Sequence, residues 1–71
     1  MRLLDANEHE ALKLFANGKS AEEIAAEMNV SRSMAQHYVR VAARKLRARN
    51  RVHAVAIAVR MGLFEVTGGG N

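Results

Sequence analysis

Residues 20–51 constrain the fold more than any other part of the chain, because they hold two helix starts separated by a very short turn. Ser20 and Glu23 have the spacing of a capping box, in which each side chain binds the backbone N–H of the other residue. Ser31 predicts a second N-cap. Asn29, just before it, suits the left-handed conformation of a sharp turn. We therefore expect a short helix, a tight turn and then a longer helix.

The longer helix is expected from residue 32 to about residue 46, with two faces of different chemistry. Its inward stripe has small or apolar residues at spacings of three and four, namely Ala35, Tyr38, Ala42 and Leu46. Its outward stripe is polar and mostly basic, namely Arg32, Ser33, Gln36, His37, Arg40, Arg44 and Arg47. A tight turn followed by a helix with a polar outer face is typical of DNA-reading helix-turn-helix units.

The distribution of charge supports the same interpretation. The formal net charge is +4, and none of the seven acidic residues lies between residues 28 and 64. Eight of the eleven basic residues do lie there, namely Arg32, Arg40, Arg44, Lys45, Arg47, Arg49, Arg51 and Arg60. Because this stretch contains no acidic partners, we expect few salt bridges along it. The basic face is interpreted as an electrostatic footprint for phosphates rather than as a merely solvated surface.

Composition and capping signals predict an all-α fold with four helices in one small domain. The 71 residues include no Pro and no Cys, and only 4% are aromatic, which favours helices and excludes a disulfide framework. The first helix is expected at residues 6–16, between a capping box of Asp5 and Glu8 and a stop at Gly18. We expect the domain to span residues 1–66 and residues 67–71 to form a flexible tail.

The last helix is expected at residues 51–61, after an N-cap at Asn50, and it is apolar around most of its circumference. A helix packed on one side only needs a polar face, and this one has little beyond His53 and Arg60. One apolar face should pack inward and another should meet a partner, which predicts a homodimer. The candidate interface residues are Val52, Ala54, Val55, Ile57, Ala58 and Met61. The sequence leaves open which apolar face is outermost.

Residues 4–63 resemble the LuxR/FixJ-type (NarL- or GerE-like) DNA-binding domain of bacterial regulators. The matching residues are Glu8, Glu10, Leu12, Gly18, Ser20, Glu23, Ile24, Ala25, Val30, Ser31, Lys45, Leu46, Asn50, Arg51, Ala54 and Val55. The resemblance implies a four-helix helix-turn-helix fold in which the third helix enters the major groove and the fourth often dimerises. Met34, Tyr38 and Arg47 stand where the family usually has Thr, His and Gly.

The resemblance and the side-chain chemistry together nominate DNA contacts. Gln36, His37 and Arg40 stand where the family touches base edges, and bidentate hydrogen bonding suits Gln to adenine and Arg to guanine. The candidate phosphate contacts are Lys19, Ser20, Ser31, Arg32, Ser33, Arg44, Lys45, Arg49 and Arg51. In the family the Thr at the position of Met34 commonly helps to fix a phosphate, so this contact is expected to be missing here.

Several other classes of protein fit the sequence less well. No nucleophile accompanies a His and a third orienting group, so an enzyme is not expected. No cofactor is expected, and His9, His37 and His53 are too far apart along the chain to indicate a zinc site. No apolar run reaches the roughly 18 residues of a membrane span. We therefore expect a cytoplasmic, nucleoid-associated protein.

Three functions remain open at the level of the sequence. The favoured one is a small stand-alone bacterial regulator of transcription that binds operator DNA as a dimer, an expectation based on the initial Met and the complete domain. The alternative is a protein-binding modulator that uses the same fold to sequester a regulator or an RNA polymerase subunit. A promoter-recognition piece of a sigma-like factor is a third. A pure adaptor has little need for Arg32, Arg40 and Arg44 on one helix.

Overall fold

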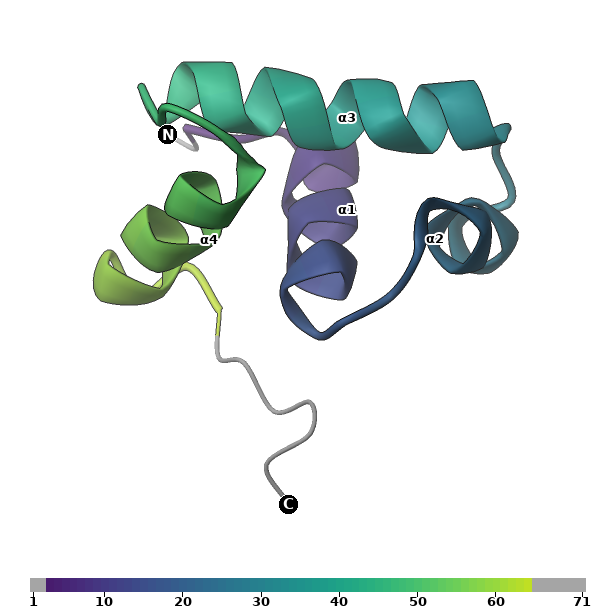
Figure 1. Cartoon of the computed structure of the whole chain (residues 1–71), viewed down its shortest axis with the longest axis horizontal. Coiled ribbons are helices and arrows are strands. Elements are labelled where there is room, and N and C mark those ends of the chain that lie inside the picture. Colours follow the sequence, from purple (N-terminus) through teal and green to yellow (C-terminus); the bar gives the residue numbers. More distant parts are fainter. Residues whose placement is uncertain (1–2, 65–71) are drawn as a thin grey trace.

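The computed structural model describes residues 3–64 of the chain. They form four helices, α1 (Ala6–Ala16), α2 (Ala21–Met28), α3 (Arg32–Lys45) and α4 (Arg51–Arg60), and no strand occurs in this part. In Figure 1, α3 lies across the top, with α1 beneath its middle and α2 and α4 beneath its two ends. The predicted all-α fold is confirmed, and α3 and α4 each end one residue earlier than expected. The predicted domain limit at residue 66 and the predicted tail lie outside the described residues.

Two capping boxes fix the starts of α1 and α2. Asp5 Oδ1 accepts a hydrogen bond from the Glu8 backbone N–H at 2.8 Å, and Glu8 Oε1 accepts one from the Asp5 N–H at 3.1 Å. Ser20 and Glu23 make the same reciprocal pair at 3.1 and 2.8 Å. These bonds satisfy N–H groups that have no partner inside a helix, so both predicted helix starts are confirmed.

The turn between α2 and α3 is as tight as the sequence predicts. Asn29 ends α2 in the left-handed conformation, with φ 58° and ψ 48°. The backbone N–H of Val30 then binds the Ala25 carbonyl at 3.0 Å. Ser31 opens α3, because its Oγ accepts a hydrogen bond from the Met34 N–H at 3.0 Å. With only three residues between the helices, the direction of α3 relative to α2 is set by local chemistry.

The core is built from small side chains packed under α3. The inward residues of α3 are Ala35, Val39, Ala42 and Ala43, followed by the C-cap Leu46, and none is more than 7% exposed. Leu12 of α1 and Ile24 of α2 are the largest fully buried side chains among the described residues. Because α3 contacts each of the other three helices, its buried face is broad. Small residues let those helices approach it closely.

The prediction that Tyr38 lies on the inward stripe needs correction. Val39, one position along α3, takes the central place and is 2% exposed. Tyr38 is half-buried at the edge of the core, and its hydroxyl oxygen accepts a hydrogen bond from Asn7 Nδ2 at 3.3 Å. A spacing of three and four fits either residue, so the choice depends on where α1, α2 and α4 pack. The phenol keeps its polar tip at the surface while its ring covers the core.

The segment after α4 turns back over α1. Gly62, with φ 75°, takes the left-handed conformation just beyond the helix. Leu63 and Phe64 then pack against the core and are half-buried. His9 Nε2 donates a hydrogen bond to the Leu63 carbonyl at 2.9 Å, and its ring meets the Phe64 ring edge-on with centroids 5.6 Å apart. The end of the described chain is therefore held to the first helix.

Candidate nucleic-acid interface

The outer face of α3 carries a stripe of exposed polar side chains. Ser33, His37, Arg40 and Arg44 are all exposed and are spaced by four, three and four residues, so they lie along one side of the helix. We call these four residues the outer face of α3. No acidic residue lies in this helix, and Arg44 and Lys45 in its last turn complement the negative end of the helix dipole. The stripe has the donors and the length needed to meet a nucleic-acid groove.

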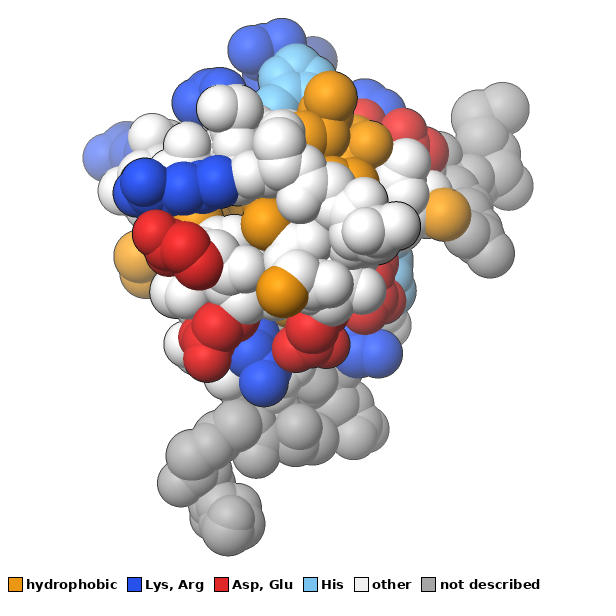
Figure 2. All heavy atoms as spheres, turned by 90° about the vertical axis from the view of Figure 1, so that its right-hand side faces the viewer, with side chains coloured by type: hydrophobic (Ala, Val, Ile, Leu, Met, Phe, Trp, Pro, Cys, Tyr) orange, Lys and Arg blue, Asp and Glu red, His pale blue; other side chains and the backbone are white. Residues whose placement is uncertain are grey.

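Charge is segregated on the surface near α2 and the start of α3. Figure 2 views this side and shows acidic side chains gathered over its lower part, whereas most of the basic ones lie toward the top, where α3 runs. The exposed acids of α2 are Glu22, Glu23 and Glu27. A single basic side would orient the domain on a polyanion, because the acidic side would be repelled.

Lys45 contacts a buried carboxylate of α1 and does not belong to the outer face of α3. Its Nζ lies 2.6 Å from Glu8 Oε1, and the Glu8 side chain is only 8% exposed. A buried carboxylate without a partner is costly, so Lys45 neutralises it at the junction of α1 and α3. The expectation that the basic stretch lacks acidic partners is wrong here, because the acid comes from 37 positions away in the sequence. We therefore no longer count Lys45 among the candidate phosphate contacts.

Two further candidate phosphate contacts have exposed acidic partners. Lys19 Nζ lies 3.4 Å from Glu27 Oε2, and Arg32 Nε lies 3.4 Å from Glu22 Oε2. All four side chains are between 41% and 66% exposed, so the pairs contribute little to stability. A phosphate can displace such partners at small cost. Arg32 and Lys19 thus remain candidates, although the sequence analysis did not anticipate their pairing.

Two of the three serine candidates, Ser20 and Ser31, already cap helices. Their Oγ atoms accept hydrogen bonds from the Glu23 N–H and the Met34 N–H, and a hydroxyl can also donate its own proton to a phosphate oxygen. At the first cap the Ser20 backbone N–H, then its hydroxyl and the charge of Lys19, lower the pKa of Glu23 against a small opposing effect of burial. The Glu23 carboxylate therefore stays ionised and keeps the cap closed.

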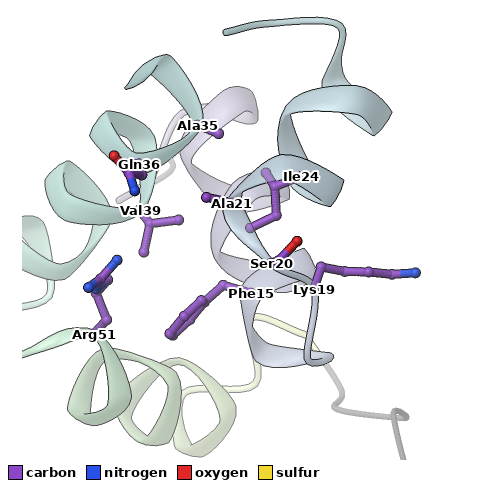
Figure 3. A pocket seen from close by; sticks show the side chains of 9 residues that line it. All are labelled: Phe15, Lys19, Ser20, Ala21, Ile24, Ala35, Gln36, Val39 and Arg51. Carbon is purple, nitrogen blue, oxygen red and sulfur yellow. The ribbon is translucent and has the colours of Figure 1, made fainter. Parts of the chain in front are cut away.

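Gln36 is the one predicted base contact that is half-buried. It lines an open hollow of about 90 Å³ at which all four helices meet (Figure 3). The lining residues are Phe15 of α1, Lys19 and Ser20 before α2, Ala21 and Ile24 of α2, Ala35, Gln36 and Val39 of α3, and Arg51 of α4. The sequence analysis did not find this hollow, because its residues come from four separated segments.

Arg51 projects into the hollow from the start of α4. Its guanidinium carbon lies 5.8 Å from the centroid of the Phe15 ring, the geometry of a cation–π contact. In Figure 3 the side chains of Arg51, Phe15 and Val39 point toward one another, whereas Lys19 extends away. Arg49, two residues earlier, is exposed, and its backbone N–H donates to His53 Nδ1 at 3.0 Å. Arg49 thus lies on the turn that leads from α3 into α4, and Arg51 is the first residue of α4.

The structure buries two of the six residues that were predicted to form a dimer interface through α4. Ala54 and Ala58 are fully buried against the rest of this chain, so they cannot contact a second copy, and this part of the prediction is corrected. Val55 and Ile57 are half-buried and pack on the core. The physical reason is that the two alanines are the smallest residues on the inward side and let α4 approach α1 and α3 closely.

Three apolar side chains form an exposed stripe on the opposite side of α4. Val52 is 73% exposed and Val59 is 42% exposed, with the exposed Ala56 between them. We call Val52, Ala56 and Val59 the outer stripe of α4, and the exposed Met61 follows it. The list of candidate interface residues included Val52 and Met61 but neither Ala56 nor Val59. Their spacing of four and three residues is a signal that the sequence does contain.

Between residues 3 and 64 no three His, Asp or Glu side chains come together as they would around a metal ion. None of the four helices has both the length and the apolar character needed to cross a membrane. Met34 is 41% exposed beside the outer face of α3, where the family usually has Thr.

A tri-helical core with a tightly connected α2–α3 pair and a further packed helix defines a helix-turn-helix domain of the kind that bacterial regulators use. Residues 3–58 match the family described as bacterial regulatory proteins, luxR family. The match covers well over half of the chain, and the chain belongs to this family. The family is one of transcription regulators, and the resemblance inferred from the sequence is confirmed.

Two curated relatives are similar over most of this chain. It is 42% identical over 57 residues to "Transcriptional activator protein BjaR1" from Bradyrhizobium diazoefficiens, a match that covers 80% of this chain and 24% of that protein. It is 32% identical over 62 residues to "Transcriptional regulatory protein DesR" from Bacillus subtilis, covering 87% of this chain and 31% of that protein. The chain thus spans about a quarter to a third of the length of these relatives.

Two solved structures share the four-helix arrangement. "Structure of Transcription factor, GerE" superposes with a TM-score of 0.88 at 21% identity, covering 94% of this chain and all of that one. "VqmA bound to DPO" superposes with a TM-score of 0.80 at 27% identity, covering 93% of this chain and 33% of that one. The first likeness shows the fold alone, and the fold it shows is the one predicted.

Proposed function

We propose that the domain binds double-stranded DNA and regulates transcription, with α3 lying in the major groove. The observation that carries the proposal is the outer face of α3, where Ser33, His37, Arg40 and Arg44 are all exposed on a helix that contains no acid. An α-helix with such donors on one side fits the width of the major groove. Membership of a family of transcription regulators supports the same function.

Within this proposal, base reading and phosphate binding fall to different residues. His37 and Arg40 are exposed at the middle of α3 and are assigned to base edges. Gln36, the third predicted base contact, is half-buried at the rim of the hollow and is not assigned to a base. The phosphate contacts are assigned to Lys19, Ser20, Ser31, Arg32, Ser33, Arg44, Arg49 and Arg51. Contacts of this second kind set the position of α3 and contribute most of the affinity.

We also infer that two copies pair through the outer stripe of α4. Val52, Ala56 and Val59 offer apolar surface with a small residue at the centre, which suits a helix packed on its own symmetry mate. Two-fold pairing would place two copies of α3 in successive major grooves, about one helical turn apart. The stripe is small, so we expect a weak dimer that DNA stabilises by mass action. A location in the cytoplasm, in association with the nucleoid, is part of the same proposal.

Selection of bound sites from random duplex DNA tests the proposal most directly. It should return a two-fold symmetric site, and binding to that site should weaken steeply with salt. The slope of log affinity against log salt is expected to be on the order of −5 to −10 for a dimer, at about −0.9 per phosphate contacted. Binding that ignores salt would contradict the role given to the arginines. One chain of 7.8 kDa per site at saturation, measured by sedimentation, would exclude the dimer.

A second candidate function has its own supporting observation. The exposed Val52, Val59 and Met61 would equally serve a modulator that binds a regulator or an RNA polymerase subunit through α4. The two functions respond differently to the same variants. Arg40→Ala with Arg44→Ala should abolish the effect on transcription if DNA is bound directly. The double variant should retain the effect if α4 alone does the work.

A further inference from the structure

We propose that the hollow among the four helices is a seat for one backbone phosphate of the bound duplex, with Arg51 as its main ligand. The inference rests on the proposed DNA binding and adds a defined site to it. Figure 3 shows Arg51, Gln36 and Ser20 on three sides of one space, each from a different part of the fold. None of the nine lining residues is acidic. The site therefore has hydrogen-bond donors and positive charge without an internal counter-charge.

Arg51 differs from the other cations that the fold has already paired. Lys45, Lys19 and Arg32 each lie within 3.4 Å of a carboxylate oxygen. Within residues 3–64 no carboxylate makes such a pair with Arg51, whose guanidinium lies instead over the Phe15 ring. A guanidinium held near a ring by a cation–π contact uses none of its N–H groups there, so they are free to bind two phosphate oxygens at once. Phe15 is thus a positioning residue that holds the ligand in place.

Two neutral groups complete the donor set. The Ser20 Oγ accepts a hydrogen bond from the Glu23 N–H, and its hydroxyl proton, which also lowers the pKa of Glu23, can turn to a phosphate oxygen. Gln36 offers its amide NH₂ from α3. Behind these donors the wall consists of Phe15, Ile24 and Val39, which exclude water from the contacts and strengthen them. The ionised Glu23 does not line the hollow, and its carboxylate is engaged by the Ser20 N–H.

Phosphate binding in the hollow would fix the position of α3 in the major groove. Gln36 lies on α3 between the hollow and the outer face, one position before His37 and four before Arg40. A phosphate held by Arg51 and Ser20 therefore fixes α3 along and around its own axis relative to one strand. Because every duplex has this phosphate, losing the seat should weaken binding to all sequences alike and leave base preference unchanged.

Salt-dependent binding of Arg51→Gln and Phe15→Leu tests the seat, with Arg60→Gln as the matched control. Arg60 is exposed at the other end of α4, so its variant removes the same charge from the same helix. Arg51→Gln should lower affinity about tenfold and reduce the salt slope by about 0.9 per bound chain. Phe15→Leu keeps the charge, so it should lower affinity about threefold with an unchanged slope. The double variant should be no weaker than Arg51→Gln alone, and Phe15→Tyr should bind like the wild type.

A slope for Arg51→Gln equal to that of the wild type and of Arg60→Gln would overturn the seat while the proposed DNA binding stands. Additive losses for Phe15→Leu and Arg51→Gln would likewise overturn the positioning role. Titration of the DNA-free chain with inorganic phosphate, followed by NMR, gives an independent readout. Signals of Ser20, the Gln36 amide and the Arg51 Nε should shift together in the wild type and not in Arg51→Gln. Shifts spread evenly over all arginines would overturn the seat, and clustered shifts without duplex binding would refute the proposed function instead.

Discussion

The two helices α3 and α4 distribute their apolar residues in opposite ways. α3 turns Val39 inward, followed by Leu46 at its C-cap, and leaves polar groups outside. α4 turns its alanines Ala54 and Ala58 inward, both 0% exposed, and leaves the larger Val52 and Val59 in solvent. Burying the valines and exposing the alanines would remove more apolar area from water. Burial within one chain therefore does not explain the orientation of α4.

Close packing explains that orientation. α4 crosses both α1 and α3, and only residues as small as alanine allow the helix axes to approach so closely. The cost is an exposed valine stripe, and each valine left in water forgoes roughly 1.5 kcal/mol of burial. In α3 the apolar side chains are mostly buried within the monomer, and the outer face is polar and open to a polar ligand. In α4 the apolar outer stripe stays exposed unless another surface covers it. For this reason we propose that a second copy of the chain packs on that stripe.

The sharpest way to break this comparison is to place the same charge on the two sides of α4. Ala58→Glu puts an unpaired carboxylate into the core and should destabilise the fold by about 4 kcal/mol or more, enough to lose helical circular dichroism. Val59→Glu, one position along, should leave the helix content intact and abolish pairing on palindromic DNA in sedimentation. An unfolded Val59→Glu, or a folded and monomeric Ala58→Glu, would show that the two faces are assigned the wrong way round.

Substitutions at two neighbouring positions of α3 should separate an effect on stability from an effect on DNA recognition. Val39→Ala removes two buried carbons and should cost about 2 kcal/mol of unfolding free energy while base preference stays the same. Arg40→Ala should change stability by less than about 0.5 kcal/mol and cost roughly 1–3 kcal/mol of discrimination between the selected site and random DNA. Urea unfolding and competition binding measure the two effects. Intact discrimination in Arg40→Ala would move the reading face elsewhere.

Two neighbouring residues at the end of α3 should likewise separate an effect on stability from an effect on DNA binding. Lys45→Ala leaves the buried Glu8 with the Asp5 N–H as its remaining partner among residues 3–64. The variant should lower the unfolding free energy by about 1–2 kcal/mol, a figure reduced because Lys45 is 39% exposed. Arg44→Ala, one residue earlier and on the outer face, should weaken DNA binding and barely affect thermal unfolding. If Lys45→Ala is as stable as the wild type, the Glu8 contact does not hold α1 to α3.

The smallest expected effect concerns Arg47, in the turn between α3 and α4. Arg47 has φ 58°, a left-handed conformation that disfavours a side chain, and it stands where the family usually has Gly. Arg47→Gly should raise the unfolding free energy by about 0.5–1 kcal/mol, measured by chemical denaturation. Asn29 has the same φ, but Asn tolerates it, so Asn29→Gly should change stability by only about 0.3 kcal/mol. Equal gains at both positions would show that the strain at Arg47 is not specific to its side chain.

Local chemistry made most of the fold predictable from the sequence. The capping boxes at Asp5–Glu8 and Ser20–Glu23 need only residues three positions apart, so the helix starts could be located without knowing the fold. The left-handed turn at Asn29 depends on one residue in the same way. The exposed stripe at His37, Arg40 and Arg44 follows from helical periodicity alone. These features lie within one or two turns of chain, where spacing determines which groups meet.

Tertiary structure decided whatever depends on segments meeting from far apart. The sequence contains Glu8 and Lys45, but only the packing of α1 on α3 brings their side chains to 2.6 Å. It contains Arg51, Phe15 and Gln36, but only the meeting of four helices makes them one hollow. It also shows that α4 is apolar on nearly every side, yet the periodicity is the same for either orientation. The close approach of α1 and α3 selects Ala54 and Ala58 for the inside, because larger side chains would not fit between the helices.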